Sequence, residues 1–304
     1  VLTAEDWAAV DLLSNGRLNF GIGRGIFAYD YASVGVDSAE SRARFVEAWE
    51  IIRRLWTEDH VTYQGRFWSF RQHTLRPKPV QSPLPPVYVA CIATEASYQW
   101  AGAHGCHLMV APFLLSSTEQ QRDFLDVYRD ALATAGYDPR EFHVVGNYHL
   151  AIVENHRQLP DVDEYIFRYL DFLNQVNSNQ QASLDKGQYA AYESKDVLWQ
   201  DAQELRDHRA IVGTPQQCID RMAELADACG LTGWMFHINY GGVPHERVIV
   251  NHHDPDRSRH AASSTSGLFR VIATASRRRS PTRSGLRKSM AWLSSPRSIC
   301  VVTS

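Results

Sequence analysis

The chain has 304 residues, of which 44% are hydrophobic, 11% aromatic and 21% charged, proportions that exclude a protein disordered throughout. No apolar run reaches the roughly 18 residues that a membrane-spanning helix needs, so we expect a soluble protein that does not bind a membrane. Residues 257–304 hold ten Lys or Arg and no Asp or Glu; residues 1–256 therefore keep 21 basic and 34 acidic side chains, a balance of −13, which gives no support to nucleic-acid binding.

The first half of the chain predicts helices and strands in alternation. Residues 3–14 form an amphipathic helix in this reading, with Ala4, Trp7, Val10 and Leu13 near helical spacing. An Asn-Gly pair, typical of a helix end, follows it. The pattern then predicts a strand at 18–23, a helix at 38–56, a hairpin at 61–70, a strand at 87–91, a helix at 95–104, a strand at 107–111, a helix at 118–135 and a strand at 142–153.

The second half divides into an insertion, a last helix–strand pair and a tail. Residues 155–212 are polar and we expect them to be a mostly helical insertion. A helix begins at Pro215, since proline suits a first helical turn, and a strand follows at 233–239. From 251 to 304 the chain is rich in Ser and Arg without apolar periodicity. We interpret it as a disordered or out-of-frame extension; a basic arm for membranes or nucleic acid is the alternative.

Alternating strands and helices joined by short turns predict a parallel α/β domain over residues 1–250. Two architectures fit this pattern. A (β/α)8 barrel needs eight strands, and an open doubly wound sheet needs fewer. Periodicity alone does not decide between them. The barrel-type strands predicted here are five, at 18–23, 87–91, 107–111, 142–150 and 233–239.

Candidate anion-binding residues follow the first predicted strand. The sequence FGIGRG ends in Gly23, Arg24 and Gly25. Glycines let a phosphate or a ring approach the backbone, and an arginine offers a bidentate fork to an anion. A plain glycine-rich turn is the alternative.

Further candidates follow the later strand VYVAC and open the helix at 38–56. In ATEAS, Thr94 stands at a helix start, with Glu95 beside it and Ser97 three residues later. A helix start at the carboxyl end of a strand is suited to anions, although an ordinary N-cap uses the same residues. Arg42 lies just inside its helix, where a solvated surface arginine is the alternative. In a parallel barrel these segments would converge on the carboxyl-end face.

Cysteine and histidine spacing gives no sign of a metal site. No two cysteines have CxxC spacing and no histidines form an HxxxH or HExxH pair. We expect reduced, mostly buried thiols and a cytoplasmic protein. The chain has five cysteines, an odd number: Cys91, Cys106, Cys218, Cys229 and Cys300.

An ordered series of segments resembles the bacterial luciferase-like flavin monooxygenases over residues 1–250, apart from the insertion. The longest is AEDWAAVDLLSNGRLNFGIGRG at 4–25. The others follow in register: YASVGVD at 31–37, FVEAWEIIRRLW at 45–56, YQGRFWSF at 63–70, RPKPVQSPLPPVYVA at 76–90, SYQWAGAHG at 97–105 and VGTPQQCIDRM at 212–222.

The resemblance implies a (β/α)8 barrel that binds reduced flavin at the carboxyl ends of its strands and oxygenates a small organic substrate with O2. Arg24 and Arg42 match family arginines near the flavin phosphate, and Thr94 and Ser97 match its hydroxyl positions. Gly23 stands where luciferase has a reactive cysteine. Cys91 ends a strand, where it would either face the flavin or pack in the core.

Two departures from the family pattern affect the expected activity. The family carries about three strands before the helix at 3–14, and this sequence lacks them. We expect either that the numbering starts inside a longer gene product or that a leader has been removed. Those strands supply a catalytic histidine, and no residue here inherits that role. His107 and His237 lie on predicted strands and are interpreted as core residues. Five strands of eight do not close a barrel, so the chain alone is expected to be incomplete.

The cofactor and partners also follow from the resemblance. We expect FMN, reduced by a separate flavin reductase, with O2 and a small organic molecule as co-substrates, and a homodimer as the assembly. A deazaflavin-dependent oxidoreductase of the same fold is one alternative. A non-catalytic flavin-binding fragment is another, and a gene fragment that does not accumulate is a third. Binding of flavin or of deazaflavin separates the monooxygenase from the deazaflavin enzyme. Turnover with reduced FMN and O2 separates it from a non-catalytic flavin-binding protein, and detection of the protein in cells excludes the gene fragment.

Overall fold

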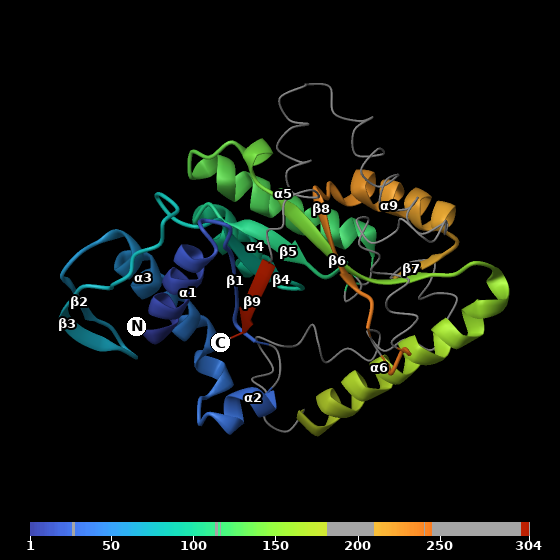
Figure 1. The fold of residues 1–304 in the computed structure, drawn as a ribbon, viewed down its shortest axis with the longest axis horizontal. Helices are drawn as coiled ribbons and strands as arrows, with labels where there is room; N and C mark the ends of the chain where they lie inside the picture. Colours follow the sequence, from blue (N-terminus) through green and yellow to red (C-terminus); the bar gives the residue numbers. More distant parts are fainter. Residues whose placement is uncertain are drawn as a thin grey trace.

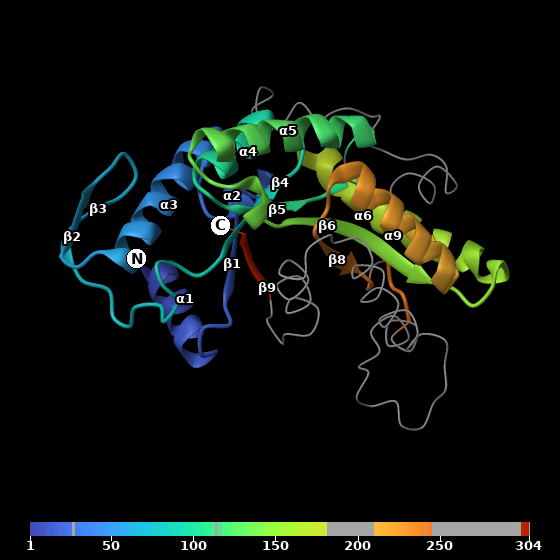
Figure 2. The same ribbon diagram turned by 90° about the horizontal axis from the view of Figure 1, so that it is seen from above.

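The computed structural model describes residues 1–25, 28–112, 115, 117–180, 210–239, 241–244 and 299–303. A seven-stranded parallel sheet forms its centre, in the order β7-β6-β5-β4-β1-β9, with β8 paired to β6. Figures 1 and 2 show this sheet curled and covered by helices on its outer face. The strands are β1 (Asn19–Gly23), β4 (Val87–Cys91), β5 (His107–Val110), β6 (Val144–Ile152), β7 (Ala210–Gly213), β8 (Gly233–His237) and β9 (Ile299–Thr303).

The helices and one hairpin surround this sheet. No helix of the described part combines the length and apolar composition needed to cross a membrane. The hairpin β2–β3 stands at the far side of α3 from the sheet (Figure 1). Its strands are β2 (Val61–Gln64) and β3 (Ser69–His73), and the helices are α1 (Leu2–Leu13), α2 (Ala28–Ser33), α3 (Ser41–Thr57), α4 (Glu95–Ala103), α5 (Thr118–Thr134), α6 (Leu159–Gln180) and α9 (Pro215–Cys229).

The two faces of the sheet have different neighbours because side chains alternate along a strand. On β4, Val89 and Cys91 belong to the main core, which also contains Tyr98 of α4 and Leu125 of α5. Tyr88 points to the other, inner face, where it packs with Met109 of β5 and Val145 of β6. Helices α4 and α5 therefore cover the outer face. The inner face is the concave side of the curled sheet, where α6 packs against β6 and β7.

The predicted apolar face of the first helix is confirmed for Ala4 and Trp7, which pack in or against the main core, and wrong for Val10 and Leu13. Val10 and Leu13 are 39% and 84% exposed, whereas Ala4, Ala8 and Asp11 are fully buried. Asp11 is buried because its carboxylate accepts hydrogen bonds from the backbone N–H groups of Val80 and Gln81, at 2.8 and 3.0 Å, and from the Gln81 amide at 2.8 Å. A polar residue thus occupies the packed side of α1 because the proline-rich segment before β4 supplies its donors.

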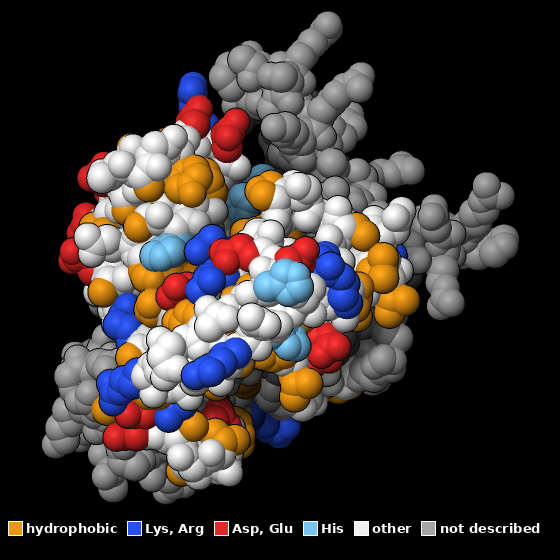
Figure 3. Space-filling view, turned by 90° about the vertical axis from the view of Figure 1, so that its left-hand side faces the viewer, with side chains coloured by type: hydrophobic (Ala, Val, Ile, Leu, Met, Phe, Trp, Pro, Cys, Tyr) orange, Lys and Arg blue, Asp and Glu red, His pale blue; other side chains and the backbone are white. Residues whose placement is uncertain are grey.

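The hairpin is attached to α3 through carboxylates. Glu47, on α3, is buried and accepts from three successive backbone N–H groups, those of Arg66, Phe67 and Trp68. Glu40 forms ion pairs with Arg44 at 2.9 Å and with Arg66 at 2.6 Å. On this side of the molecule acidic, basic and apolar side chains are interspersed (Figure 3). These contacts fix the hairpin over the outer side of α3.

The strand count differs from the prediction of five. β7 lies at the end of the predicted insertion, and its four residues were assigned to that polar, mostly helical segment. Within the predicted disordered tail, 299–303 pairs in parallel with β1, whose edge N–H and C=O groups otherwise lack ladder partners. The helical prediction for the insertion is confirmed over α6. Residues 181–209 and 245–298 lie outside the described part.

Candidate functional site

The turn after β1 presents the first candidate residues. Gly23 ends the strand, and Gly25 adopts a φ of +83°, a left-handed conformation that glycine accepts without strain. The Tyr31 hydroxyl, from α2, donates to the carbonyl of Arg24 and, at 3.3 Å, to that of Gly25. These hydrogen bonds fix the backbone of the turn. Arg24 therefore lies at the carboxyl end of β1 in a defined backbone conformation.

The starts of α3 and α4 meet at the same place. Arg42 of α3 donates through Nη2 to the Ser97 hydroxyl of α4 at 3.3 Å. The hydroxyls of Thr94 and Ser97 are 2.8 Å apart. Thr94 is the N-cap of α4, yet its side chain does not cap a backbone N–H. The first amide groups of α4 therefore point toward the same region as two hydroxyls and a guanidinium.

Four of the predicted residues, Gly23, Arg24, Arg42 and Ser97, line a small hollow at the carboxyl ends of β1 and β4, whereas Gly25 and Thr94 are not part of its lining. Its lining comprises Gly23, Arg24, Arg42, Phe45, Val89, Ala90, Ser97 and Trp100. Both arginines act on the same buried thiol: burial raises the pKa of Cys91, and the charges of Arg24 and Arg42 partly oppose that rise. Two cations and a helix N-terminus around one hollow make it suited to an anion such as a phosphate monoester.

Trp100 is a residue that the sequence reading missed. It lines the hollow, and its indole nitrogen is buried without a hydrogen-bond partner in the described part of the chain. An unsatisfied buried donor costs about 1–3 kcal/mol unless a ligand accepts from it. The sequence does contain a hint of its role, because Trp100 follows Ser97 by three residues and a spacing of three places both side chains on one side of α4.

Two predicted residues lie away from the hollow. Cys91 is 1% exposed within the main core, on the helix-facing side of β4. Its raised pKa keeps it a protonated thiol. Glu95 is the first residue of α4 and its side chain is exposed. The carboxylate of Glu95 complements the helix dipole, and a negative charge does not add to binding of an anion.

A second polar cluster lies on the concave face, on β6, β8 and α6. The Asn147 amide is 3.2 Å from Nε2 of His237. The rings of His149 and His237 are inclined at 86°, with their centroids 5.2 Å apart. The ring centroid of Tyr169 of α6 lies 5.0 Å from that of His149. Burial lowers the pKa of His149 to about 3 and also lowers that of His237. Both imidazoles are therefore neutral near pH 7.

The buried imidazole of His149 makes stability depend on pH. Between its ordinary pKa of 6.5 and about 3, the unfolded chain binds a proton there that the folded chain does not. Stability should therefore fall as the pH falls through this window, by about 1.4 kcal/mol per pH unit for one such group. Urea unfolding at pH 6.5 and 4.5 measures it. In His149→Gln the fall between pH 6.5 and 4.5 should be smaller by about 1.4 kcal/mol per pH unit. Equal falls in His149→Gln and in the unaltered chain would contradict the assignment.

The chain matches known proteins along most of its length. Residues 1–232 match the family model described as luciferase-like monooxygenase. The chain is 35% identical over 121 residues to the oxygenase component of a flavin-dependent trigonelline monooxygenase from Acinetobacter baylyi, covering 39% of this chain and 33% of that protein. It is 26% identical over 238 residues to the alkanal monooxygenase alpha chain of the Kryptophanaron alfredi symbiont, covering 75% and 65%. It thus spans between a third and about two thirds of these relatives.

Solved structures share the same architecture. The monooxygenase RslO1 from Streptomyces bottropensis superposes with a TM-score of 0.64 at 26% identity, covering 81% of this chain and 69% of that one. An F420-dependent secondary alcohol dehydrogenase gives a TM-score of 0.61 at 16% identity, covering 82% and 71%; this likeness concerns the fold alone. The curled parallel sheet is therefore part of a barrel of this type, which confirms the fold expected from the sequence.

Proposed function

The chain belongs to the luciferase-like monooxygenase family, and from this premise we propose that it is a flavin-dependent monooxygenase that uses reduced FMN and O2 to oxygenate a small organic molecule. Flavin-dependent monooxygenases are among its relatives. The observation that carries the proposal is the hollow between β1 and β4, where Arg24, Arg42 and Ser97 come together. A phosphate monoester distinguishes FMN from riboflavin, and these groups suit that phosphate.

One physical feature of the described residues supports FMN. The orphaned indole N–H of Trp100 beside the hollow needs an acceptor, and a phosphate oxygen supplies one. Arg42 and Ser97 already share a hydrogen bond, so the donors are held together before a ligand binds. Preorganised donors lose less conformational freedom on binding, which favours affinity. In this proposal Gly23 and Gly25 let the flavin approach the backbone, and Thr94 supports Ser97.

The protein's own residues would bind and orient the reactants, and FMN when bound would supply the oxygen chemistry. The phosphate donors fix one end of the flavin at the carboxyl edge of the sheet. The neutral pair His149 and His237 lies on the concave face of the same sheet and would offer uncharged hydrogen-bonding groups to a reactant. The role of catalytic base is assigned to no described residue.

The proposal includes partners and a location. A flavin reductase would supply reduced FMN, as the wording "oxygenase component" in a relative's name suggests. We take residues 1–250 as the flavin-binding domain and a homodimer as the assembly, to be checked by sedimentation. A cytoplasmic location is supported by the buried free thiols of Cys91, Cys106, Cys218 and Cys229.

The test combines binding with turnover. Fluorescence titration should give tighter binding of FMN than of riboflavin, because only FMN carries the phosphate, and F420 should bind more weakly than FMN. A flavin reductase with NADH then supplies reduced FMN under O2, and products are followed by mass spectrometry. The first substrates to try are trigonelline and an alkanal, which the relatives' names suggest. The expected product carries one oxygen atom from labelled O2.

Each alternative has its own outcome in this test. Substrate reduction or oxidation with F420 and without O2 would overturn the monooxygenase proposal in favour of a deazaflavin enzyme. Tight FMN binding without any product across the substrate panel would favour a non-catalytic flavin-binding protein. Equal affinity for FMN and riboflavin would contradict the phosphate site itself.

A further inference from the structure

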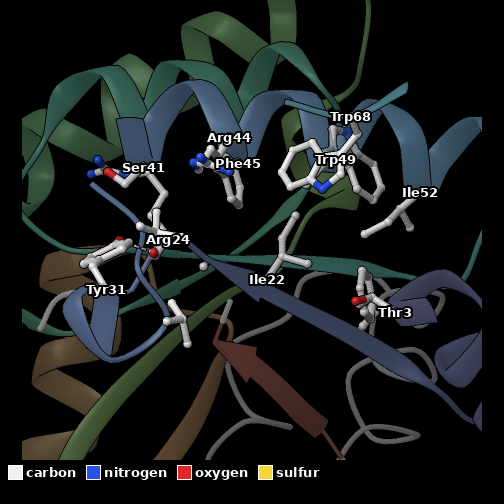
Figure 4. Close-up of a pocket in the computed structure, with 15 residues that line it drawn as sticks. Thr3, Ile22, Arg24, Tyr31, Ser41, Arg44, Phe45, Trp49, Ile52 and Trp68 are labelled. Carbon is white, nitrogen blue, oxygen red and sulfur yellow. Dashed lines mark hydrogen bonds between the residues drawn. The ribbon is translucent and has the colours of Figure 1, made fainter. Parts of the chain in front are cut away.

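We propose that a cavity between α3 and β1 binds a small, neutral, apolar molecule that carries one hydrogen-bond acceptor, such as an aryl ketone or an aldehyde. The cavity has a volume of about 270 Å³. Figure 4 shows Phe45, Trp49 and Ile52 projecting from α3 toward Ile22 of β1, with Thr3 at one end and Tyr31 at the other. The cavity lies on the outer, helix-covered face of β1, opposite the concave inner face of the sheet.

The lining specifies an apolar occupant. Most of it is aromatic or aliphatic, and the rings that contribute are Phe20, Tyr31, Phe45, Trp49 and Trp68. Aromatic walls of this kind gain from contact with a planar or aliphatic ligand and lose little conformational freedom on binding. Arg44 also lines the cavity, but its guanidinium is paired with Glu40 at 2.9 Å and stacks over Phe67 at 4.2 Å. Its charge is therefore already compensated. Arg24, the other cation of the lining, also borders the phosphate hollow, where it is assigned to the anion, so the ligand of the cavity need not be an anion.

One hydrogen-bond donor left unsatisfied by the described residues, the indole N–H of Trp49, requires an acceptor on the ligand. Trp49 is 5% exposed and its indole nitrogen is buried without a hydrogen-bond partner among the described residues. Such a donor is costly to leave unsatisfied, so native proteins rarely retain one without a partner. A carbonyl oxygen on an otherwise apolar ligand would accept from it. A hydrocarbon of equal size would fill the cavity but leave the donor unsatisfied.

The volume sets the size of the ligand. An engineered apolar cavity of about 150 Å³ holds benzene, so a cavity of about 270 Å³ accepts roughly ten non-hydrogen atoms by proportion. Acetophenone is of this size and has one carbonyl. α-Methylstyrene has the same shape with a CH2 group in place of the oxygen. The two compounds therefore differ in the acceptor alone.

The cavity adjoins the phosphate hollow described above. Gly23, Arg24 and Phe45 line both. A ligand in the cavity would contact the same side chains that border the anion, so its binding should change the affinity for phosphate compounds, and the effect should be reciprocal. The cavity proposal itself does not depend on the identity of the flavin.

Binding of the two probes to the full chain, followed by isothermal titration calorimetry, tests the proposal. Acetophenone should bind roughly three- to tenfold more tightly than α-methylstyrene, the range expected for one net hydrogen bond. Trp49→Phe keeps an aromatic ring but removes the N–H, so it should abolish that difference. Ala48→Leu adds bulk to the cavity wall and should weaken both probes at least about tenfold, by the cost of overpacking. Ala43→Leu, at an exposed position of the same helix, is the matched control and should change neither.

Two results would overturn the proposal. One is equal affinity for the two probes in the unaltered chain, since the acceptor would then have no partner. The other is binding that Ala48→Leu leaves unchanged, since the probes would then sit elsewhere. If neither probe binds and sedimentation shows a dimer that Ala48→Leu dissociates, the cavity is an interface between two copies and not a ligand site. Urea unfolding of each variant verifies that it is folded.

Discussion

Replacing Arg42 with alanine is expected to weaken FMN binding about 10- to 100-fold, the range for losing a hydrogen bond to a charged group. Arg42 reaches from α3 to the Ser97 hydroxyl of α4 and lines the hollow that we assign to the phosphate. Its loss removes one of two cations there and leaves Ser97 without this donor. Riboflavin has no phosphate, so its affinity should change less than twofold.

The control is Arg53→Ala on the same helix. Arg53 is exposed, so its removal changes the net charge equally without touching the hollow. Fluorescence titration of FMN and riboflavin with both variants isolates the phosphate contribution. A parallel loss for FMN and riboflavin in Arg42→Ala would mean that Arg42 contacts the ring system or acts only through folding. An equal loss in Arg53→Ala would mean that the effect is one of general charge.

Replacing Asp11 with alanine should lower the free energy of unfolding by about 3 kcal/mol, because it leaves buried donors unsatisfied. The fully buried carboxylate accepts two backbone N–H groups, of Val80 and Gln81, and the Gln81 amide. It therefore joins α1 to the segment that leads into β4. Urea denaturation followed by circular dichroism measures the loss.

Asp6→Ala is the matched control, since Asp6 is an exposed aspartate on the same helix and its removal should change stability by less than about 0.5 kcal/mol. Asp11→Asn should fall between the two, because the amide keeps one acceptor oxygen but brings a donor toward other donors. If Asp11→Ala proves as stable as Asp6→Ala, water replaces the carboxylate and the segment at 80–81 is not fixed by it.

The sequence by itself determined the family and the fold class, and it predicted where an anion site would lie. Each of these is carried by local pattern. Strand and helix periodicities with short turns select a parallel α/β arrangement, and in such a sheet the segments after successive strands meet at one edge. Gly23, Arg24, Arg42, Thr94 and Ser97 were predicted for that reason, and the structure places them around one hollow or hydrogen-bonded to its lining.

Tertiary structure alone decided which face each element buries. Periodicity placed Ala4, Trp7, Val10 and Leu13 on the apolar face of α1. Ala4 and Trp7 do pack in or against the core, but Val10 and Leu13 are exposed, because the segment at 80–81 offers donors to Asp11 and that side of the helix faces inward. The same applies to Cys91, whose position at a strand end leaves open which face of the sheet it takes. β7 and β9 were missed because each lies in or beside a segment of polar composition, where a short strand depends on pairing with its neighbours. A pairing partner, a donor or a cavity wall distant in sequence is a property of the folded chain, so a local pattern does not contain it.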